Sequence, residues 1–174
     1  MDPQASLAAD DFTLFDLPRR FTLDPAALDA KWKALQGAAH PDRHASDTPA
    51  ARRLAMQWAV RINEAHRRLR DPLARAAYLC ELSGHDVAAE SNTAMPPEFL
   101  LQQMAWREAL AEAADTAEIE ALGAQVARAR HGLHAELESA IDQADLVDWP
   151  TVAGRVRRLM FIDRFLSDVD RKLD

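Results

Sequence analysis

The sequence contains few cysteines, glycines and aromatic residues, and each shortage argues against a class of protein. Cys80 is the only cysteine in 174 residues, so an internal disulfide framework and a zinc site built from paired cysteines are both excluded. Five glycines and 6% aromatic residues, beside abundant alanine, leucine, arginine and glutamate, favour helices over strands. The 48% of apolar residues is typical of a folded globular chain. We therefore expect an all-α protein of one or two small domains.

Long apolar runs and an excess of basic charge are also missing. No run approaches the roughly 18 apolar residues of a membrane span, and the first residues have no export-signal pattern. These features predict a cytoplasmic protein without a membrane partner. The net charge of −7 argues against a nucleic-acid partner, because phosphate neutralisation supplies most of that affinity. Residues 1–85 carry 12 basic and 11 acidic side chains, whereas residues 86–174 carry 9 and 17, which suggests two surfaces with different partners.

The motifs of common enzymes are absent as well. The sequence has no Gly-rich phosphate loop and no nucleophile elbow, and no convergent set of titrating groups stands out. His40, Asp42 and His44 resemble a partial ligand set, and His131 and His134 lie one helical turn apart, but each set lacks further ligands. We expect no enzymatic activity, no cofactor and no metal.

Prolines mark where helices begin in the first half of the chain. A capping residue followed by proline occurs at Asp24-Pro25, Thr48-Pro49 and Asp71-Pro72, and proline fits the first turn of a helix. Apolar residues at helical spacing then predict a helix up to Gly37, a long helix after Pro49, and a shorter helix over 72–82 closed by Gly84. With a short apolar turn over 12–17, these segments predict a compact unit of four helices.

The second half reads as three long helices. Residues 84–95 have no clear periodicity and lead into Pro96-Pro97. Helices are predicted from Pro97, from the capping box Asp115–Glu118, and from near Asp148, each with an apolar stripe. We predict a first domain over 1–83, a connecting segment over 84–95, and a three-helix bundle over 96–174.

A stiff turn joins the first two long helices. Proline at 41 forces the preceding residue out of the helical region, so His40, Pro41 and Asp42 form a defined corner. By itself this triplet is most simply a hydrophilic turn. In its setting, after a helix with Lys31 and Lys33 and before a long second helix, it resembles the J-domain of DnaJ-type co-chaperones. The resemblance implies that His40, Pro41 and Asp42, with Lys31, Lys33 and Arg43, dock on a DnaK-type ATPase chaperone and trigger its ATP hydrolysis.

Further segments narrow the resemblance to the HscB family of iron–sulfur cluster co-chaperones. These are the opening Asp-Phe-Thr-Leu-Phe at 11–15, the segment Arg-Ala-Ala-Tyr-Leu at 75–79, and the acidic helical second half. The resemblance implies an HscA-type chaperone as partner and the scaffold protein IscU as client. The helix before the triplet has only two lysines, Lys31 and Lys33, and an acid, Asp29, lies close to them in the sequence. This small positive charge departs from the family pattern and weakens the expected docking on the chaperone.

The helix from Pro97 has apolar residues outside its core stripe. At 100° per residue, Leu100, Leu101 and Met104 fall away from the stripe that contains Phe99 and Trp106, and Phe161 points away from the stripe of the last helix. One interpretation is that these residues fill a second face of the bundle. The other is a docking surface with an acidic rim. The HscB resemblance favours the second and assigns scaffold binding to Leu100, Leu101, Met104, Glu108, Glu112 and Phe161, with Ala105 where the family often has an acid.

Two alternatives to this function stay open. One is a J-protein that serves another client, and the other is a helical adaptor in which the His-Pro-Asp triplet is accidental. We expect a monomer in either case.

Overall fold

The computed structural model describes residues 8–39, 48–87 and 95–174, and every regular element in these ranges is a helix. The chain divides into two compact units, Met1–Tyr78 and Leu79–Asp174. The division falls within a helix, whereas the sequence places a connecting segment at 84–95, of which 88–94 lie outside the described residues. Within the described ranges, no helix is long and apolar enough to cross a bilayer.

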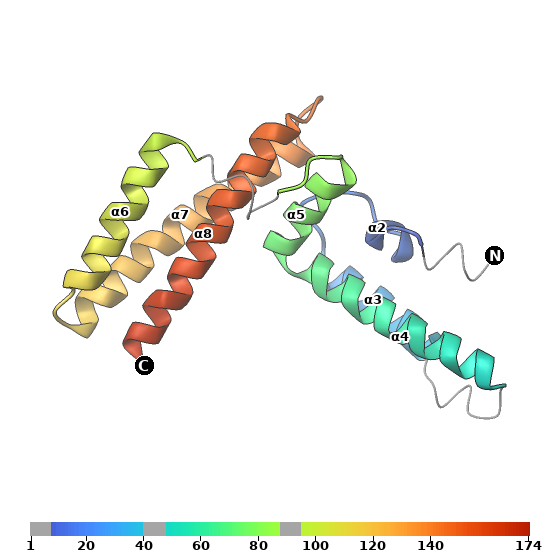
Figure 1. The fold of residues 1–174 in the computed structure, drawn as a ribbon. Helices are drawn as coiled ribbons and strands as arrows, with labels where there is room; N and C mark the ends of the chain where they lie inside the picture. The colour runs from blue at the N-terminus through green and yellow to red at the C-terminus, as the bar shows by residue number, and fades with distance from the viewer. Residues whose placement is uncertain (1–7, 40–47, 88–94) are drawn as a thin grey trace. The chain divides into compact units, whose positions relative to one another are not determined.

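The first unit is built on a helical hairpin. Helices α3 (Pro25–Ala39) and α4 (Pro49–Arg70) lie side by side, with the short α2 (Asp11–Leu14) against α4 (Figure 1). The helix α5 (Pro72–Leu82) begins in this unit. Burial of large side chains from all of these elements removes apolar surface from water and holds the unit together. The fully buried ones of the first unit are Phe12, Phe15, Leu28, Ile62 and Leu69.

The predicted helix starts are confirmed by their capping contacts. The side chains of Asp24 and Asp71 accept hydrogen bonds from backbone N–H groups of the first helical turn, both at 2.9 Å, ahead of α3 and α5. Thr48 Oγ1 accepts from the Ala51 N–H at 3.3 Å ahead of α4. Each cap satisfies an N–H group that the helix itself leaves unpaired.

One predicted helix end is wrong and another is confirmed. The α3 helix does not stop at Gly37 but continues to Ala39, because glycine permits a helix to end without requiring it. Gly84, after α5, has φ +78°, and the N–H of His85 donates to Cys80 O while that of Gly84 donates to Glu81 O, both at 2.9 Å. This hydrogen-bond pattern is a Schellman motif, whose left-handed residue is usually glycine.

The second unit contains three long helices, α6 (Pro97–Glu112), α7 (Thr116–Asp142) and α8 (Trp149–Leu173) (Figure 1). Ion pairs show that α7 and α8 run antiparallel, since Glu136 pairs with Arg155 while the earlier Arg130 pairs with the later Asp163. One half of the predicted capping box is present, because Glu118 N–H donates to Asp115 Oδ1, but the Glu118 carboxylate accepts from the N–H of Ala114, the residue before the cap. The fully buried seam of α7 and α8 includes Val126, Leu137, Val152, Val156 and Leu159.

Candidate functional site

The predicted chaperone-binding residues are placed only in part. His40, Pro41, Asp42 and Arg43 lie outside the described residues, so their geometry stays a prediction. Lys31 and Lys33 lie on α3, and Lys33 is exposed. The Lys31 ammonium donates to the backbone oxygen of Asp16 and pairs with its carboxylate at 3.1 Å. Lys31 therefore also fastens the turn after α2, where Asp16 has φ +49°.

Polar and aromatic contacts fix α3 against α4 in this unit. Trp32 Nε1 donates to Asn63 Oδ1 at 2.9 Å, and its ring stacks on His66 with centroids 4.8 Å apart. His66 Nε2 lies 2.7 Å from Asp29 Oδ1, and this hydrogen bond lowers the pKa of Asp29. The two helices that flank the His-Pro-Asp triplet are thereby held in a fixed register.

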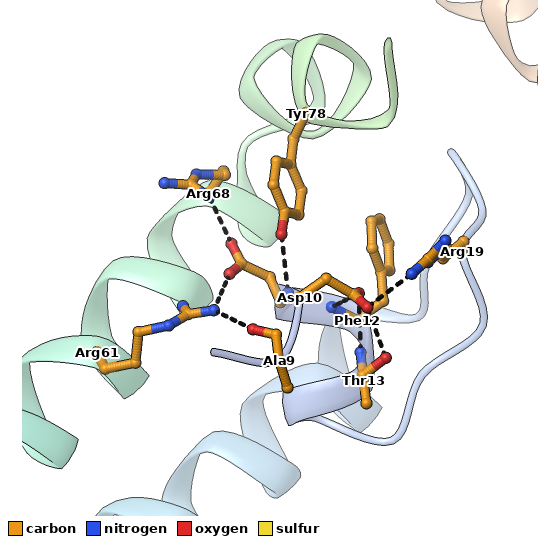
Figure 2. Close-up of polar contacts among 9 residues, drawn as sticks. Ala9, Asp10, Phe12, Thr13, Arg19, Arg61, Arg68 and Tyr78 are labelled. Carbon is orange, nitrogen blue, oxygen red and sulfur yellow. Dashed lines mark hydrogen bonds and ion pairs between the residues drawn. The ribbon is translucent and has the colours of Figure 1, made fainter. Parts of the chain in front are cut away.

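A buried carboxylate attaches α2 to the rest of the first unit through Arg61 and Arg68, which are labelled in Figure 2. Asp11 is completely buried, and its carboxylate oxygens lie 2.6 Å from Arg61 Nη2 and 3.2 Å from Arg68 Nη1. Its backbone N–H donates to Tyr78 Oη at 3.0 Å, and the Arg68 guanidinium lies 4.6 Å from the centre of the Tyr78 ring. The sequence pattern did not predict this cluster. Its signs in the sequence are an aspartate followed by a phenylalanine at 11–12 and two arginines seven positions apart, at 61 and 68.

The neighbouring Asp10 caps α2 from the surface. Its carboxylate accepts from the N–H groups of Phe12 and Thr13 and pairs with Arg19 at 2.8 Å. Burial alone would raise the pKa of Asp10, but the hydrogen bonds from Arg19 and Thr13 outweigh it and lower the pKa to about 2.

In the second unit, α6 presents an apolar face to solvent. Leu101 and Met104 are each 67% exposed and Leu100 is 44% exposed, and Glu108 and Glu112 are exposed on the same helix. On the opposite side of α6, Phe99 and Trp106 are buried. The interpretation that Leu100, Leu101 and Met104 fill the core is therefore wrong, because the bundle covers only one side of α6.

Phe161 lies off the α7–α8 seam, as its place on the last helix predicts, but α6 partly covers it. It is half-buried on α8, with its ring edge-on to Phe99 at 5.8 Å and stacked on Phe165 at 6.1 Å between centroids. The helical count gives the face of α8 on which Phe161 lies, but it does not show that α6 covers part of that face. The Arg107 guanidinium lies 5.4 Å from the centre of the Phe161 ring, a contact that the sequence did not suggest.

No group of three or more metal-ligating side chains lies close together within the part of the chain that the structure describes. His131 is exposed on α7, and Cys80 is buried. Burial raises the pKa of the Cys80 thiol to about 11, which keeps it protonated and unreactive at neutral pH.

Known proteins resemble this chain in sequence and in fold. A co-chaperone protein HscB homolog from Azoarcus sp. (strain BH72) is 47% identical over 171 residues, which make up 97% of this chain and 96% of that protein. The chain belongs to the HscB co-chaperone family. The HscB homolog of Burkholderia multivorans is 48% identical over 169 residues, 97% of each chain. The family model described as the HSCB C-terminal oligomerisation domain matches residues 95–170.

Solved HscB structures share the arrangement of helices. Chaperone HscB from Vibrio cholerae superposes with a TM-score of 0.80 at 34% identity, covering 95% of this chain and 100% of that one. Human co-chaperone HscB gives a TM-score of 0.88 at 24% identity over 95% of this chain and 82% of that one, which is a likeness of fold. The predicted all-α fold and the HscB resemblance are confirmed.

Proposed function

We propose that this HscB-family protein stimulates the ATPase of an HscA/DnaK-type chaperone and delivers the iron–sulfur scaffold IscU to it for cluster maturation and transfer. The protein is a partner of an enzyme and not itself an enzyme, and it acts in the cytoplasm as a monomer. The single observation that carries the client-binding half is the apolar face of α6, where Leu101 and Met104 are 67% exposed above a well-packed core.

The α6 face has the anatomy of a protein-binding surface. Leucine and methionine side chains supply apolar area, and the thioether of Met104 adapts its shape to a partner at little cost. Glu108 and Glu112 continue along the helix and add a polar rim. Folding alone does not explain such exposure, because the same helix buries Phe99 and Trp106 against α7 and α8.

The chaperone-binding half rests on the triplet His40, Pro41 and Asp42 with Lys31, Lys33 and Arg43. Asp42 is suited to pair with an arginine of the chaperone, and the lysines add charge that speeds encounter. Lys33, exposed on α3, is available for that charge, while Lys31 is shared with Asp16. The contacts between α3 and α4 support the proposal because they hold the two helices that flank the triplet in a fixed register.

The test is the steady-state ATPase rate of an HscA-type chaperone with this protein added, with and without IscU. We expect stimulation by the protein alone and a synergistic increase when the scaffold is present. His40→Gln or Asp42→Asn should abolish the stimulation while leaving helicity unchanged, and Glu64→Gln, an exposed acid on α4, serves as the matched control.

The client face is tested by the double variant Leu100→Ala with Met104→Ala. It should lose the synergy with IscU but keep the stimulation by itself, and its stability should change by only about 0.5 kcal/mol because both side chains are exposed. Stimulation without any synergy in the unmodified protein would indicate a J-protein for another client. A lack of stimulation would contradict the co-chaperone mechanism proposed here.

A further inference from the structure

Arg107 lies on the client face of α6, although nothing in the sequence pattern marks it for binding. It follows Met104 by one helical turn and Leu100 by two, so the three side chains emerge on the same side of the helix. Arg107 is exposed, as are Leu100 and Met104. The face is otherwise acidic, since Glu108 and Glu112 lie on the same helix. Arg107 is therefore a cation beside apolar and acidic side chains of the same helix.

The position of this cation is fixed by an aromatic ring. The Arg107 guanidinium lies 5.4 Å from the centre of the Phe161 ring, and that ring is itself held by Phe99 and Phe165. A guanidinium over an aromatic face is stabilised by the ring electrons, while its N–H donors lie in its own plane and point outward. The contact with Phe161 thus holds the charge near the ring without using any of its N–H donors.

Arg107 also lacks an acidic partner within the described ranges. Among the other arginines of this unit, Arg130, Arg155 and Arg158 each form an ion pair with a carboxylate of a neighbouring helix. Arg107 forms no such pair with a described residue, although glutamates are its neighbours in sequence. Those glutamates are one and five positions from Arg107, spacings that do not bring side chains into contact on a helix, so they border the face on its other side.

We propose that Arg107 determines client specificity by taking a carboxylate of the scaffold, while Leu100 and Met104 take an apolar side chain next to it. This inference rests on the proposed binding of IscU at α6 and adds the chemistry of the client to it. An acidic group of the client is repelled by Glu108 and Glu112 and attracted at Arg107, so the ion pair with Arg107 sets the register of the complex. Phe161 then acts as the platform that holds the guanidinium in place.

The experiment is isothermal titration of IscU into the full-length protein and its variants at low and high salt. Arg107→Gln and Arg107→Met should each weaken binding about tenfold, the loss expected for one charge-assisted hydrogen bond or ion pair. Arg107→Glu should weaken it further through repulsion. The difference between Arg107→Gln and the unmodified protein should shrink as salt is added. Arg128→Gln, a change at an exposed arginine of α7, is the control and should leave the affinity unchanged.

The variants separate a charge contact from a packing role. Methionine keeps apolar cover over Phe161 without the charge, so full affinity of Arg107→Met would overturn the inference. Unchanged binding of IscU by Arg107→Gln would overturn the inference as well. Tighter binding would also overturn it, because it would show that Arg107 shields Phe161 from the client. If the variant with alanine at 100 and 104 also binds normally, the proposed client face itself is wrong. If that variant binds weakly and Arg107→Gln does not, only the role of Arg107 fails.

Discussion

Replacing Asp11 by alanine tests the claim that a buried ion pair fastens α2 to the first unit. The carboxylate is completely buried between Arg61 at 2.6 Å and Arg68 at 3.2 Å. Removing one partner of a buried ion pair costs about 3–5 kcal/mol, because the remaining charge is left without compensation. The Arg61 and Arg68 side chains keep 22% and 43% exposure and can regain water, so we expect the low end, about 3 kcal/mol.

Urea unfolding followed by circular dichroism measures this loss, and hydrogen exchange locates it. The amides of α2 and α4 should lose protection while those of α7 keep it, because the broken contacts lie in the first unit. Asp11→Asn keeps the volume and one acceptor oxygen and should lose less stability than alanine. Glu64→Ala, which removes an exposed acid from α4, is the matched control. A change of less than about 0.5 kcal/mol for Asp11→Ala, the range of ordinary surface substitutions, would refute the reasoning.

Four further outcomes follow from individual residues. Cys80 should resist iodoacetamide at pH 8 in the folded protein and react in denaturant, since burial raises its pKa to about 11; rapid labelling of the native protein, read by mass spectrometry, would contradict this. Asp10 has a folded pKa of about 2 against an ordinary value of 3.8, so it stabilises the fold above the ordinary value and this contribution is lost as pH falls toward 2. The stability gap between Asp10→Asn and the unmodified protein should accordingly close on acidification, and a gap that persists at the lowest pH would exclude the linkage. Gly132→Ala should stabilise α7 by about 1 kcal/mol, because an added Cβ there meets nothing within 4 Å, whereas Gly84→Ala should destabilise at its φ of +78°.

The contrast between Lys31 and Lys33 bears on how the first unit meets its partner. Both were expected to supply docking charge, but the Lys31 ammonium is bound to Asp16 in the turn after α2. Any partner that recruits Lys31 must compete with that contact, while Lys33 is exposed. Engaging Lys33 therefore costs the fold less than engaging Lys31.

Local sequence determined most of the secondary structure of this protein. Proline after a capping side chain fixed the starts of α3, α4 and α5, because proline needs no N–H partner and the caps supply acceptors to the N–H groups that follow. Apolar periodicity located the seam of α7 and α8, because residues three or four positions apart lie on the same face of a helix. Gly37 shows where such local rules fail, as hydrogen bonding along α3 continues past it.

Only the tertiary structure decided which side chains meet across the chain. Asp11 becomes a buried anchor because folding brings Arg61, Arg68 and Tyr78, at least 50 positions away, around it. Phe161 and Arg107 likewise come together from separate helices, and the exposure of Met104 depends on which side of α6 the bundle covers. A helical repeat specifies the faces of a single helix, but the neighbour that covers each face is chosen by packing of the whole unit.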